Sequence, residues 1–388
     1  MRVLYSFPHS LDRAGIALTA RQQVLGLAQL GVQVVLFCTS VGTLVLPSSV
    51  EVHETMMVGT FRVPHRALGV QRAYTFHDIQ VAGWLRKNTK RIDVVHAWPR
   101  ACLHTFTTAT KAGIATLRES PNPHTASVIR QSALAAADAG VPLPPQHSHA
   151  ANLTVLAREC AEYEAATAVL VPSDYARDEF IVEGFPSSRM LQHRYGCDLT
   201  RFAARTCDPS ASPRPFRAVF VGRGDPTKGL HVALDSWRSA GLADAELLIA
   251  GSIQPDYGRS LSALLAQPNV TTLGFVDDIP ALLRSADVLL LPTWTEGSAL
   301  VTLEAQASGC VPLVSSASGA LGTPGIDFLE HAVGSRQALA EHLVLLATTP
   351  ALLKRLSARG SAQRQFLSWD RASESLARCY DEVVQRDR

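Results

Sequence analysis

Two glutamates, Glu296 and Glu304, stand eight positions apart in the stretch LPTWTEGSALVTLEAQASGC, residues 291–310. The apolar run ADVLLLP, typical of a buried strand, leads into this stretch. The pattern then predicts a helix that begins near Ser298 and ends at Gly309. Because a helix rises about 1.5 Å per residue, the two acids would lie about 12 Å apart along its axis. Paired glycosidase carboxylates lie closer, at about 5–9.5 Å, so the spacing disfavours an acid and a base acting on one glycosidic bond.

The turn between the two acids could bind an anion. The first amides of the expected helix, around Gly297 to Leu300, have no partner within the helix and can bind phosphate oxygens. Carboxylates only accept hydrogen bonds, which suits sugar hydroxyls. The two acids are therefore better placed to hold two ends of one ligand, with a diphosphate between them. The plainer interpretation is two exposed helix acids, with Glu296 favoured near the positive end of the helix dipole.

A second group of candidate residues lies in FVGRGDPTKGLHVAL, residues 220–234. A buried strand ends at Gly222, Arg223 and Lys228 flank a turn, and a helix is expected to begin near Gly229. Glycine permits a close backbone approach, and a helix N-terminus attracts anions. The planar fork of arginine and the point charge of lysine complete a diphosphate clamp. The stretch is neither a Walker A motif nor G-x-G-x-x-G, and the alternative is a solvated turn with two surface cations.

Strand and helix patterns alternate along most of the chain and must position these residues. The alternation runs from MRVLYSFP at the N-terminus to about residue 120, and it restarts after CDPSASPRP (207–215), which is the best linker in the chain. Such alternation predicts two doubly wound α/β domains, which bind ligands beyond the carboxyl ends of their parallel strands. Residues 121–150 interrupt the alternation, and we expect them to decorate the edge of the first sheet.

Composition excludes several classes of protein. The 388 residues are 47% hydrophobic and 18% charged with a net charge of +2, so no general electrostatic attraction to nucleic acid is expected. The 7 cysteines are scattered without a C-x-x-C pair, which disfavours a zinc site and a disulfide framework and favours a reducing compartment. No apolar run approaches the roughly 20 residues that span a bilayer. We therefore expect a cytoplasmic protein.

Peripheral contact with the cytoplasmic face of a membrane is an open alternative, because the chain contains two basic stretches. They are FRVPHRALGVQR (61–72) and RKNTKR (86–91), and either could face an anionic lipid or a phosphorylated acceptor. The plainer interpretation of the second stretch is a solvated helix end, where cations are favoured.

The acidic and basic groups occur together, and in that combination the chain resembles the family-4 glycosyltransferases. Glu296 and Glu304 match the E-x7-E motif of that family. The resemblance covers most of the chain, is strongest over residues 216–316, and is carried by VLVPSDYARDEF, FVGRGDPTKG, LLIAG and the stretch from LGFVDD to CVPLVS. It implies a retaining, nucleotide-sugar-dependent enzyme of the GT-B fold, with two Rossmann-like domains facing a central cleft. The implied domains are an acceptor-side domain (1–205), a nucleotide-sugar-binding domain (206–365) and a C-terminal helix (366–388) that crosses back to the first domain.

The resemblance also implies roles for individual residues. Arg223 and Lys228 match the basic pair that holds the donor diphosphate. Glu296 matches the acid that contacts the donor sugar, and Glu304 matches the acid that binds the ribose hydroxyls. The nucleobase is expected at GFVDD (274–278). The other implied donor-binding positions are Gly15, Gly222, Val276, Gly297, Ser298, Ala299 and Leu300.

The first domain departs from the family pattern in its first loop. That loop often carries two adjacent glycines in the family, and here DRAGIAL offers only Gly15. The N-domain histidine of many relatives follows a strand, and His124 in LRESPNPHTAS is the candidate for a catalytic position, with Arg118 and Glu119 nearby. His96 in VVHAW is a second candidate. The plainer interpretation of a lone histidine is structural.

The resemblance implies transfer of a sugar from a nucleotide diphosphate donor, with a UDP-sugar expected, to a hydroxyl of a glycan, lipid or small natural product. No D-x-D motif is present, so neither a metal nor a cofactor is expected beyond the nucleotide-sugar co-substrate. Arg223, Lys228 and the helix dipole would neutralise the diphosphate instead. Two alternatives stay open: another GT-B enzyme, such as a nucleotide-sugar epimerase or a sugar phosphorylase, and a non-catalytic nucleotide-sugar-binding protein.

Overall fold

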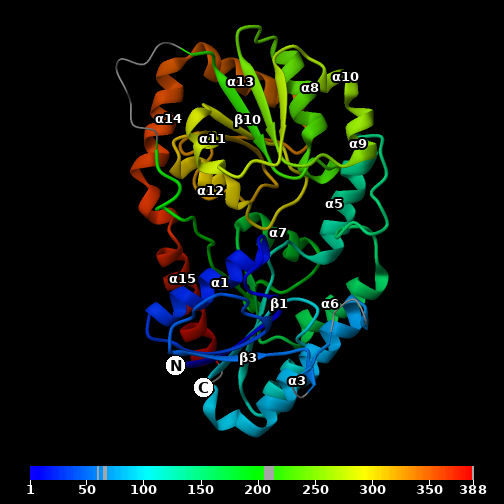
Figure 1. Cartoon of the computed structure of the whole chain (residues 1–388), viewed down its shortest axis with the longest axis vertical. Helices are drawn as coiled ribbons and strands as arrows, with labels where there is room; N and C mark the ends of the chain where they lie inside the picture. The colour runs from blue at the N-terminus through cyan, green and yellow to red at the C-terminus, as the bar shows by residue number, and fades with distance from the viewer. Residues whose placement is uncertain (59–60, 64–67, 205–213, 387–388) are drawn as a thin grey trace. The chain divides into compact units, whose positions relative to one another are not determined.

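The computed structural model describes residues 1–58, 61–63, 68–204 and 214–386, and it divides into two compact units (Figure 1). Unit 1 comprises Met1–Thr125, Asn152–Tyr195 and Trp369–Arg388, and unit 2 comprises Ala126–Ala151 and Gly196–Ser368. Most of the expected linker and the middle of the basic stretch 61–72 lie outside the described residues.

Unit 1 is built on a seven-stranded parallel sheet of order β3-β2-β1-β6-β7-β8-β9. The central strands are buried on both faces, as in Val3 to Phe7, which is why they read as continuous apolar runs. The strands are β1 (Arg2–Ser10), β2 (Gln33–Ser40), β3 (Val50–Glu54), β6 (Val94–Ala97), β7 (Ala115–Glu119), β8 (Ala168–Val171) and β9 (Met190–Gln192). A separate antiparallel pair joins β4 (Met57–Val58) and β5 (Phe61–Arg62).

Helices pack against the sheet of unit 1. They are α1 (Ile16–Gln29), α3 (Val70–Asn88), α4 (Leu103–Lys111), α6 (Leu153–Ala165), α7 (Asp174–Val182) and α15 (Trp369–Arg386). The last helix, α15, lies beside the first, α1, where Gly26 leaves room for Ser373 (Figure 1). The end of the chain is therefore part of the same unit as its beginning.

Unit 2 repeats the doubly wound design with a six-stranded parallel sheet of order β12-β11-β10-β13-β14-β15. Its strands are β10 (Arg217–Val221), β11 (Glu246–Ala250), β12 (Val270–Gly274), β13 (Val288–Leu291), β14 (Val311–Ser315) and β15 (Leu329–His331). Its helices are α8 (Leu230–Ala240), α9 (Pro255–Ser260), α10 (Ser262–Leu265), α11 (Ile279–Ser285), α12 (Leu300–Ala307), α13 (Arg336–Thr348) and α14 (Pro350–Ala362). The two parallel sheets confirm the predicted fold class.

Residues 126–151 do not follow the predicted domain boundary. The sequence places them in the first domain, whereas helix α5 (Thr125–Asp138) runs into unit 2. There Asp138 accepts hydrogen bonds from Nε2 of His231 at 2.8 Å and from Arg336 at 2.7 Å. Ala139 and Val141 pack against the core of unit 2. These contacts hold the segment on the second sheet, and helical periodicity alone does not reveal which sheet a helix covers.

The carboxyl ends of β10 and β13 lie side by side, because these two strands are neighbours in the sheet of unit 2. The carbonyl of Thr227, in the loop after β10, accepts hydrogen bonds from the amide of Trp294 at 2.8 Å and the hydroxyl of Thr293 at 2.9 Å. Gly229 has φ of 71°, and a Cβ there would collide with the carbonyl of Pro292. The two loops are thus held in direct contact.

A buried polar cluster surrounds Glu119 at the end of β7 in unit 1. The carboxylate accepts hydrogen bonds from His193 at 3.0 Å, Tyr195 at 2.8 Å and Gln23 at 3.2 Å, and it lies 3.1 Å from Nε2 of His96. Burial alone would raise the pKa of Glu119, but the charges and hydrogen bonds of His193 and His96 outweigh it and lower that pKa well below its ordinary value. His96, one of the two candidate histidines, therefore lies in the core of unit 1.

Within the described residues, none of the helices combines the length and the apolar character needed to cross a membrane.

We expect Glu119→Gln to lower the free energy of unfolding by about 3 kcal/mol at neutral pH, because its buried donors lose a charged partner. Since the pKa of Glu119 is lowered in the folded state, its stabilisation is present above the unfolded pKa of about 4.3 and is lost as the pH falls. Urea unfolding of the wild type and the variant at neutral pH and at a pH below about 4 measures this loss of stability. Glu51→Gln, at a surface carboxylate paired with Arg2, should cost less than about 1 kcal/mol. Equal losses for the two variants would contradict the buried role.

We expect Gly229→Ala to destabilise the protein by about 3 kcal/mol or more, because the new methyl group adds a backbone collision to the strain of a positive φ. Gly241→Ala, at the other end of α8, is the matched control. Gly241 has φ of 63° and no atom within 4 Å of an added Cβ, so only the strain of about 1 kcal/mol applies. Thermal unfolding of both variants measures the difference, and identical midpoints would rule out the proposed contact.

Candidate functional site

The loop after β10 presents Arg223 on a fixed turn. The guanidinium of Arg223 is half exposed and donates from Nε to the carboxylate of Asp225. The other oxygen of Asp225 accepts the amide of Thr227 at 2.9 Å, which caps the short helix Pro226–Lys228. Burial would raise the pKa of Asp225, but hydrogen bonds from His147 and Thr227 and the charge of Arg223 lower it well below its ordinary value. Asp225 is thus an ionised anchor for the turn.

Lys228 and Glu296 form an ion pair across the two loops that the Thr227 carbonyl joins. Both side chains are largely buried, with 25% of Lys228 and 15% of Glu296 exposed. Burial lowers the pKa of Lys228 to about 8, with the charge of Asp225 opposing and that of Arg223 assisting the shift. Each cation of the expected clamp is therefore paired with a carboxylate of unit 2.

The N-terminus of α12 lies directly after Glu296. The helix begins at Leu300, two residues later than predicted, and no side chain caps it. The amide of Ala299, expected to meet the ligand, instead donates to the carbonyl of Ser318 at 3.2 Å. Over the described ranges, the amides of Leu300 and Val301 make no hydrogen bond to a protein group. These two amides are available to an anion, and Val301 is a position that the sequence analysis missed.

Glu304 follows one turn later in α12. It lies four residues after Leu300, so both side chains share one face of the helix, and helical side chains lean toward the N-terminus. Its carboxylate has no hydrogen-bond donor among the described residues. Burial raises the pKa of Glu304 to about 7, against the charge of Arg201. A partly buried carboxylate without a protein donor suits the hydroxyls of a ligand.

The other predicted donor positions of unit 2 lie in turns at the same strand ends. Gly222 follows β10 with φ of 156°, and Gly297 and Ser298 form the turn before α12. Val276 follows β12 and packs against the apolar cluster that includes Leu289. Phe275 beside it is 84% exposed. The strands β12, β10 and β13 thus contribute one turn each to the carboxyl edge of the sheet.

The two predicted positions of the first domain lie in unit 1. Gly15 precedes α1 with φ of 74° and open space where a side chain would stand. His124 is 8% exposed, and its ring packs against Tyr163 and Phe180 with centroids 4.9 and 5.2 Å away. The nearby Arg118 is buried and pairs with carboxylates of α6. A catalytic role for His124 stays a prediction.

A further histidine contacts the loop after β10, and a second lies beside it. Nε2 of His147 lies 3.0 Å from Arg223 and 3.6 Å from the carboxylate of Asp225. His149 lies beside His147, with ring centroids 5.5 Å apart. The sequence analysis missed both residues because it assigned the segment after α5 to the first sheet. The sequence signal that could have pointed to them is the pair of histidines in QHSHA, but this pair belongs to no known motif.

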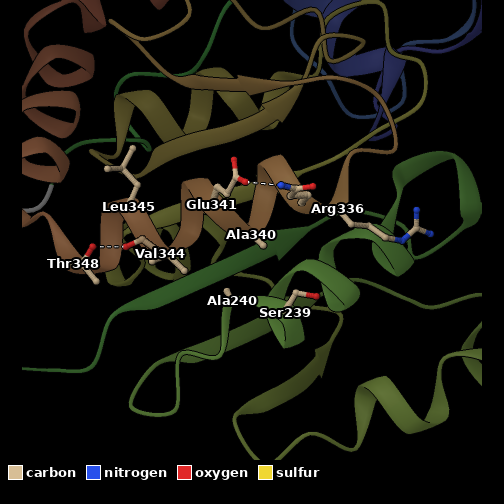
Figure 2. Close-up of a pocket in the computed structure, with 9 residues that line it drawn as sticks. Ser239, Ala240, Arg336, Ala340, Glu341, Val344, Leu345 and Thr348 are labelled. Atoms are coloured by element: carbon tan, nitrogen blue, oxygen red, sulfur yellow. Dashed lines mark hydrogen bonds between the residues drawn. The ribbon is translucent and has the colours of Figure 1, made fainter.

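A pocket of about 780 Å³ lies between α8 and α13 of unit 2 (Figure 2). Arg336 at its edge is held by Asp138 and Asp235, and Gln337 donates to Glu341 within α13. None of the predicted site residues lines this pocket. In the part of the chain that the structure describes, no three His, Cys, Asp or Glu side chains gather as a metal-binding group would require.

Comparison with known proteins supports the relationship seen in the sequence. Residues 215–349 match the family model of group 1 glycosyl transferases. D-inositol 3-phosphate glycosyltransferase of Mycobacterium tuberculosis is 27% identical over 290 residues, which cover 67% of this chain and 56% of that protein. The chain therefore spans about half the length of the curated relatives that it matches.

Solved structures match nearly the whole chain. Sucrose-phosphate synthase from Thermosynechococcus elongatus aligns with a TM-score of 0.73 at 17% identity and covers 99% of both chains. Alr3699/HepE from Anabaena, solved in complex with UDP, has a TM-score of 0.68 at 16% identity and covers 98% of this chain and 100% of that one. WaaG, a glycosyltransferase involved in lipopolysaccharide biosynthesis, has a TM-score of 0.66 at 15% identity, with 98% and 99% covered. The chain therefore has the GT-B fold, and the part of unit 2 that spans residues 215–349 is similar to the group 1 glycosyl transferases.

Proposed function

We propose that the chain transfers a sugar from a nucleotide diphosphate donor, with a UDP-sugar as the expected donor, to a hydroxyl of a glycan, lipid or natural-product acceptor, with retention at the anomeric carbon. The observation that carries the proposal is the convergence of Arg223, Lys228 and the uncapped start of α12 at one edge of the unit 2 sheet. Similar structures of Alr3699/HepE were solved with UDP and with UDP-glucose, which favours UDP as the nucleotide.

The diphosphate would bind between the two loops and the start of α12. As the glycosyl bond breaks, negative charge grows on the leaving phosphate. Arg223, Lys228 and the amides of Leu300 and Val301 can stabilise that charge, and each charge-assisted hydrogen bond contributes about 1.5–3 kcal/mol. No nucleophile of the protein is assigned. Attack by the acceptor on the same face, with the leaving phosphate taking its proton, is the step expected for the family.

Donor binding would exchange the partners of an ion pair. In the free chain Lys228 is held by Glu296. A diphosphate that takes Lys228 releases the Glu296 carboxylate, which can then accept hydrogen bonds from the hydroxyls of the donor sugar. Hydrogen bonds from the sugar to Glu296 therefore offset the loss of the ion pair. A nucleotide without a sugar would leave Glu296 without a partner. This exchange links recognition of the sugar to recognition of the phosphate.

Glu304 would bind the ribose hydroxyls. Its carboxylate lies on the same helix whose first amides meet the phosphate, so one rigid element positions both contacts. The nucleobase would lie at the turn around Val276, where backbone groups are available. The exposed ring of Phe275 stands next to that turn.

We expect UDP or a UDP-sugar to raise the unfolding temperature in a thermal-shift screen that also includes GDP, ADP and dTDP sugars. Lys228→Ala should weaken nucleotide binding by about 10- to 100-fold, because one charge-assisted contact is lost. Lys354→Ala, at an exposed lysine of α14, should leave binding unchanged. A protein that no nucleotide stabilises would contradict the proposal.

Product analysis separates the alternatives. With a UDP-sugar labelled at the anomeric carbon, the proposal predicts a glycoside whose anomeric configuration matches that of the donor. Isomerised donor without transfer would indicate an epimerase, and a sugar phosphate formed with inorganic phosphate would indicate a phosphorylase. Nucleotide affinity that survives in Lys228→Ala would favour a non-catalytic binding protein with a different site.

We expect Glu296→Gln to tighten the binding of UDP by about 3- to 10-fold while lowering kcat with a UDP-sugar by at least about 100-fold. The substitution removes the carboxylate that competes with the diphosphate for Lys228, and it also weakens the contact with the transferred sugar. Calorimetric titration with UDP and steady-state kinetics measure the two effects. A variant with weaker binding of UDP would argue against the exchange of partners.

A further inference from the structure

The segment after α5 brings two histidines to the loop that carries Arg223. One end of the segment is anchored in unit 2 by the contacts of Asp138 with His231 and Arg336. At its other end the backbone amide of His149 donates to Nδ1 of His147 at 3.2 Å. Nε2 of the same ring lies 3.0 Å from the guanidinium of Arg223 and 3.6 Å from the carboxylate of Asp225. His147 thus positions both the loop after β10 and its own neighbour.

His149 is a half-buried histidine whose ring nitrogen Nδ1 is unusual. Its Nδ1 is buried and has no hydrogen-bond partner among the described residues. Leaving a buried polar atom without a partner is unfavourable. Burial lowers the pKa of His149 to about 4, and the charges of His147, Lys228 and Arg223 lower it further against that of Asp225. The free chain therefore holds a neutral imidazole where cations surround it.

The charges of the free site cancel before any donor arrives. Arg223 is paired with Asp225, and Lys228 is paired with Glu296. The diphosphate of a nucleotide-sugar carries two negative charges into this partly buried place, where uncompensated charge is costly. The start of α12 supplies only about half a positive charge. A neutral imidazole beside the two cations can supply further positive charge by taking up a proton.

We propose that His149 is a further ligand of the donor diphosphate, and that it takes up a proton when the anion binds beside Arg223 and Lys228. The inference rests on the proposed function and deepens it, since it assigns a third segment of unit 2 to the donor site. An arriving anion reverses the electrostatic balance at the imidazole and provides the partner that Nδ1 lacks. The groups whose charges act on the imidazole of His149 are His147 on its own segment and Arg223, Asp225 and Lys228 on the loop after β10.

The test compares His149→Gln with His342→Gln. His342 in α13 is a matched control, because its Nδ1 is also buried without a partner among the described residues and its pKa is also lowered by burial. Calorimetric titrations use UDP and uridine at about pH 6 and about pH 8.5, where an imidazole in an anion complex would be charged and neutral, respectively.

The proposal predicts that His149→Gln weakens the binding of UDP about 10-fold at the lower pH and about 2-fold or less at the higher pH. Binding of uridine, which lacks phosphate, should be unchanged, and His342→Gln should bind both probes like the wild type. Titrations in two buffers of different ionisation enthalpy should show about one proton fewer taken up by His149→Gln than by the wild type. Equal affinity for UDP in all three proteins at both pH values would overturn the inference and leave the proposed function standing.

A second measurement needs no variant. Nuclear magnetic resonance of the wild-type protein with isotope-labelled histidine and assigned ring signals follows the imidazole of His149, whose pKa burial lowers to about 4 in the free chain. Saturation with UDP should raise its pKa by at least about 2 units. An imidazole whose titration does not change with UDP would overturn the inference. If UDP and the other nucleotides fail to bind the wild type at all, the proposed function fails first and the inference falls with it.

Discussion

The carbonyl of Thr227 holds the two loops of unit 2 together, and the rest of the site depends on that contact. It accepts one hydrogen bond from the backbone and one from a hydroxyl of the loop after β13. The contact requires a glycine at position 229, where any side chain would meet the carbonyl of Pro292. Because β10 and β13 are adjacent parallel strands, the same contact places Lys228 on Glu296. A basic turn and an acidic turn, about 70 residues apart in the chain, become one site.

In the free chain the two cations of the site are each paired with a carboxylate of the same unit. Carboxylates keep both cations in place without a ligand, and they limit the cost of burying them. Two backbone amides at the start of α12 and the carboxylate of Glu304 are left without protein partners. An anionic ligand with hydroxyl groups at both ends would satisfy all of these groups. The proposed role of His149 agrees with this arrangement. Its imidazole is neutral in the free chain, lies in a basic cluster, and can become charged when an anion binds.

Much of the fold and of the site in unit 2 could be predicted from the sequence. The continuous apolar runs of β10 and β13 mark buried parallel strands, and the glycines and charges that follow them mark the loops at their ends. The spacing of Glu296 and Glu304 disfavours an acid and base pair and predicts two binding groups on either side of a helix N-terminus. The resemblance to a known family adds the roles of these residues.

The rest depends on tertiary contacts that no local pattern encodes. The side of α5 that packs on the second sheet is set by Asp138 and two apolar neighbours, and this contact is what brings His147 and His149 to Arg223. The amide of Ala299 was expected to be free, yet the carbonyl of Ser318 lies within reach only once β14 is in place. Burial of His96 beside Glu119 likewise follows from the packing of β6 and β7.

A crystal structure of the protein with UDP tests the central claim most directly. The account predicts that the diphosphate oxygens lie within hydrogen-bond distance of Arg223, Lys228 and the amide of Leu300, and that the Lys228–Glu296 ion pair is broken. A nucleotide bound elsewhere, or a diphosphate bound while Lys228 remains on Glu296, would contradict it.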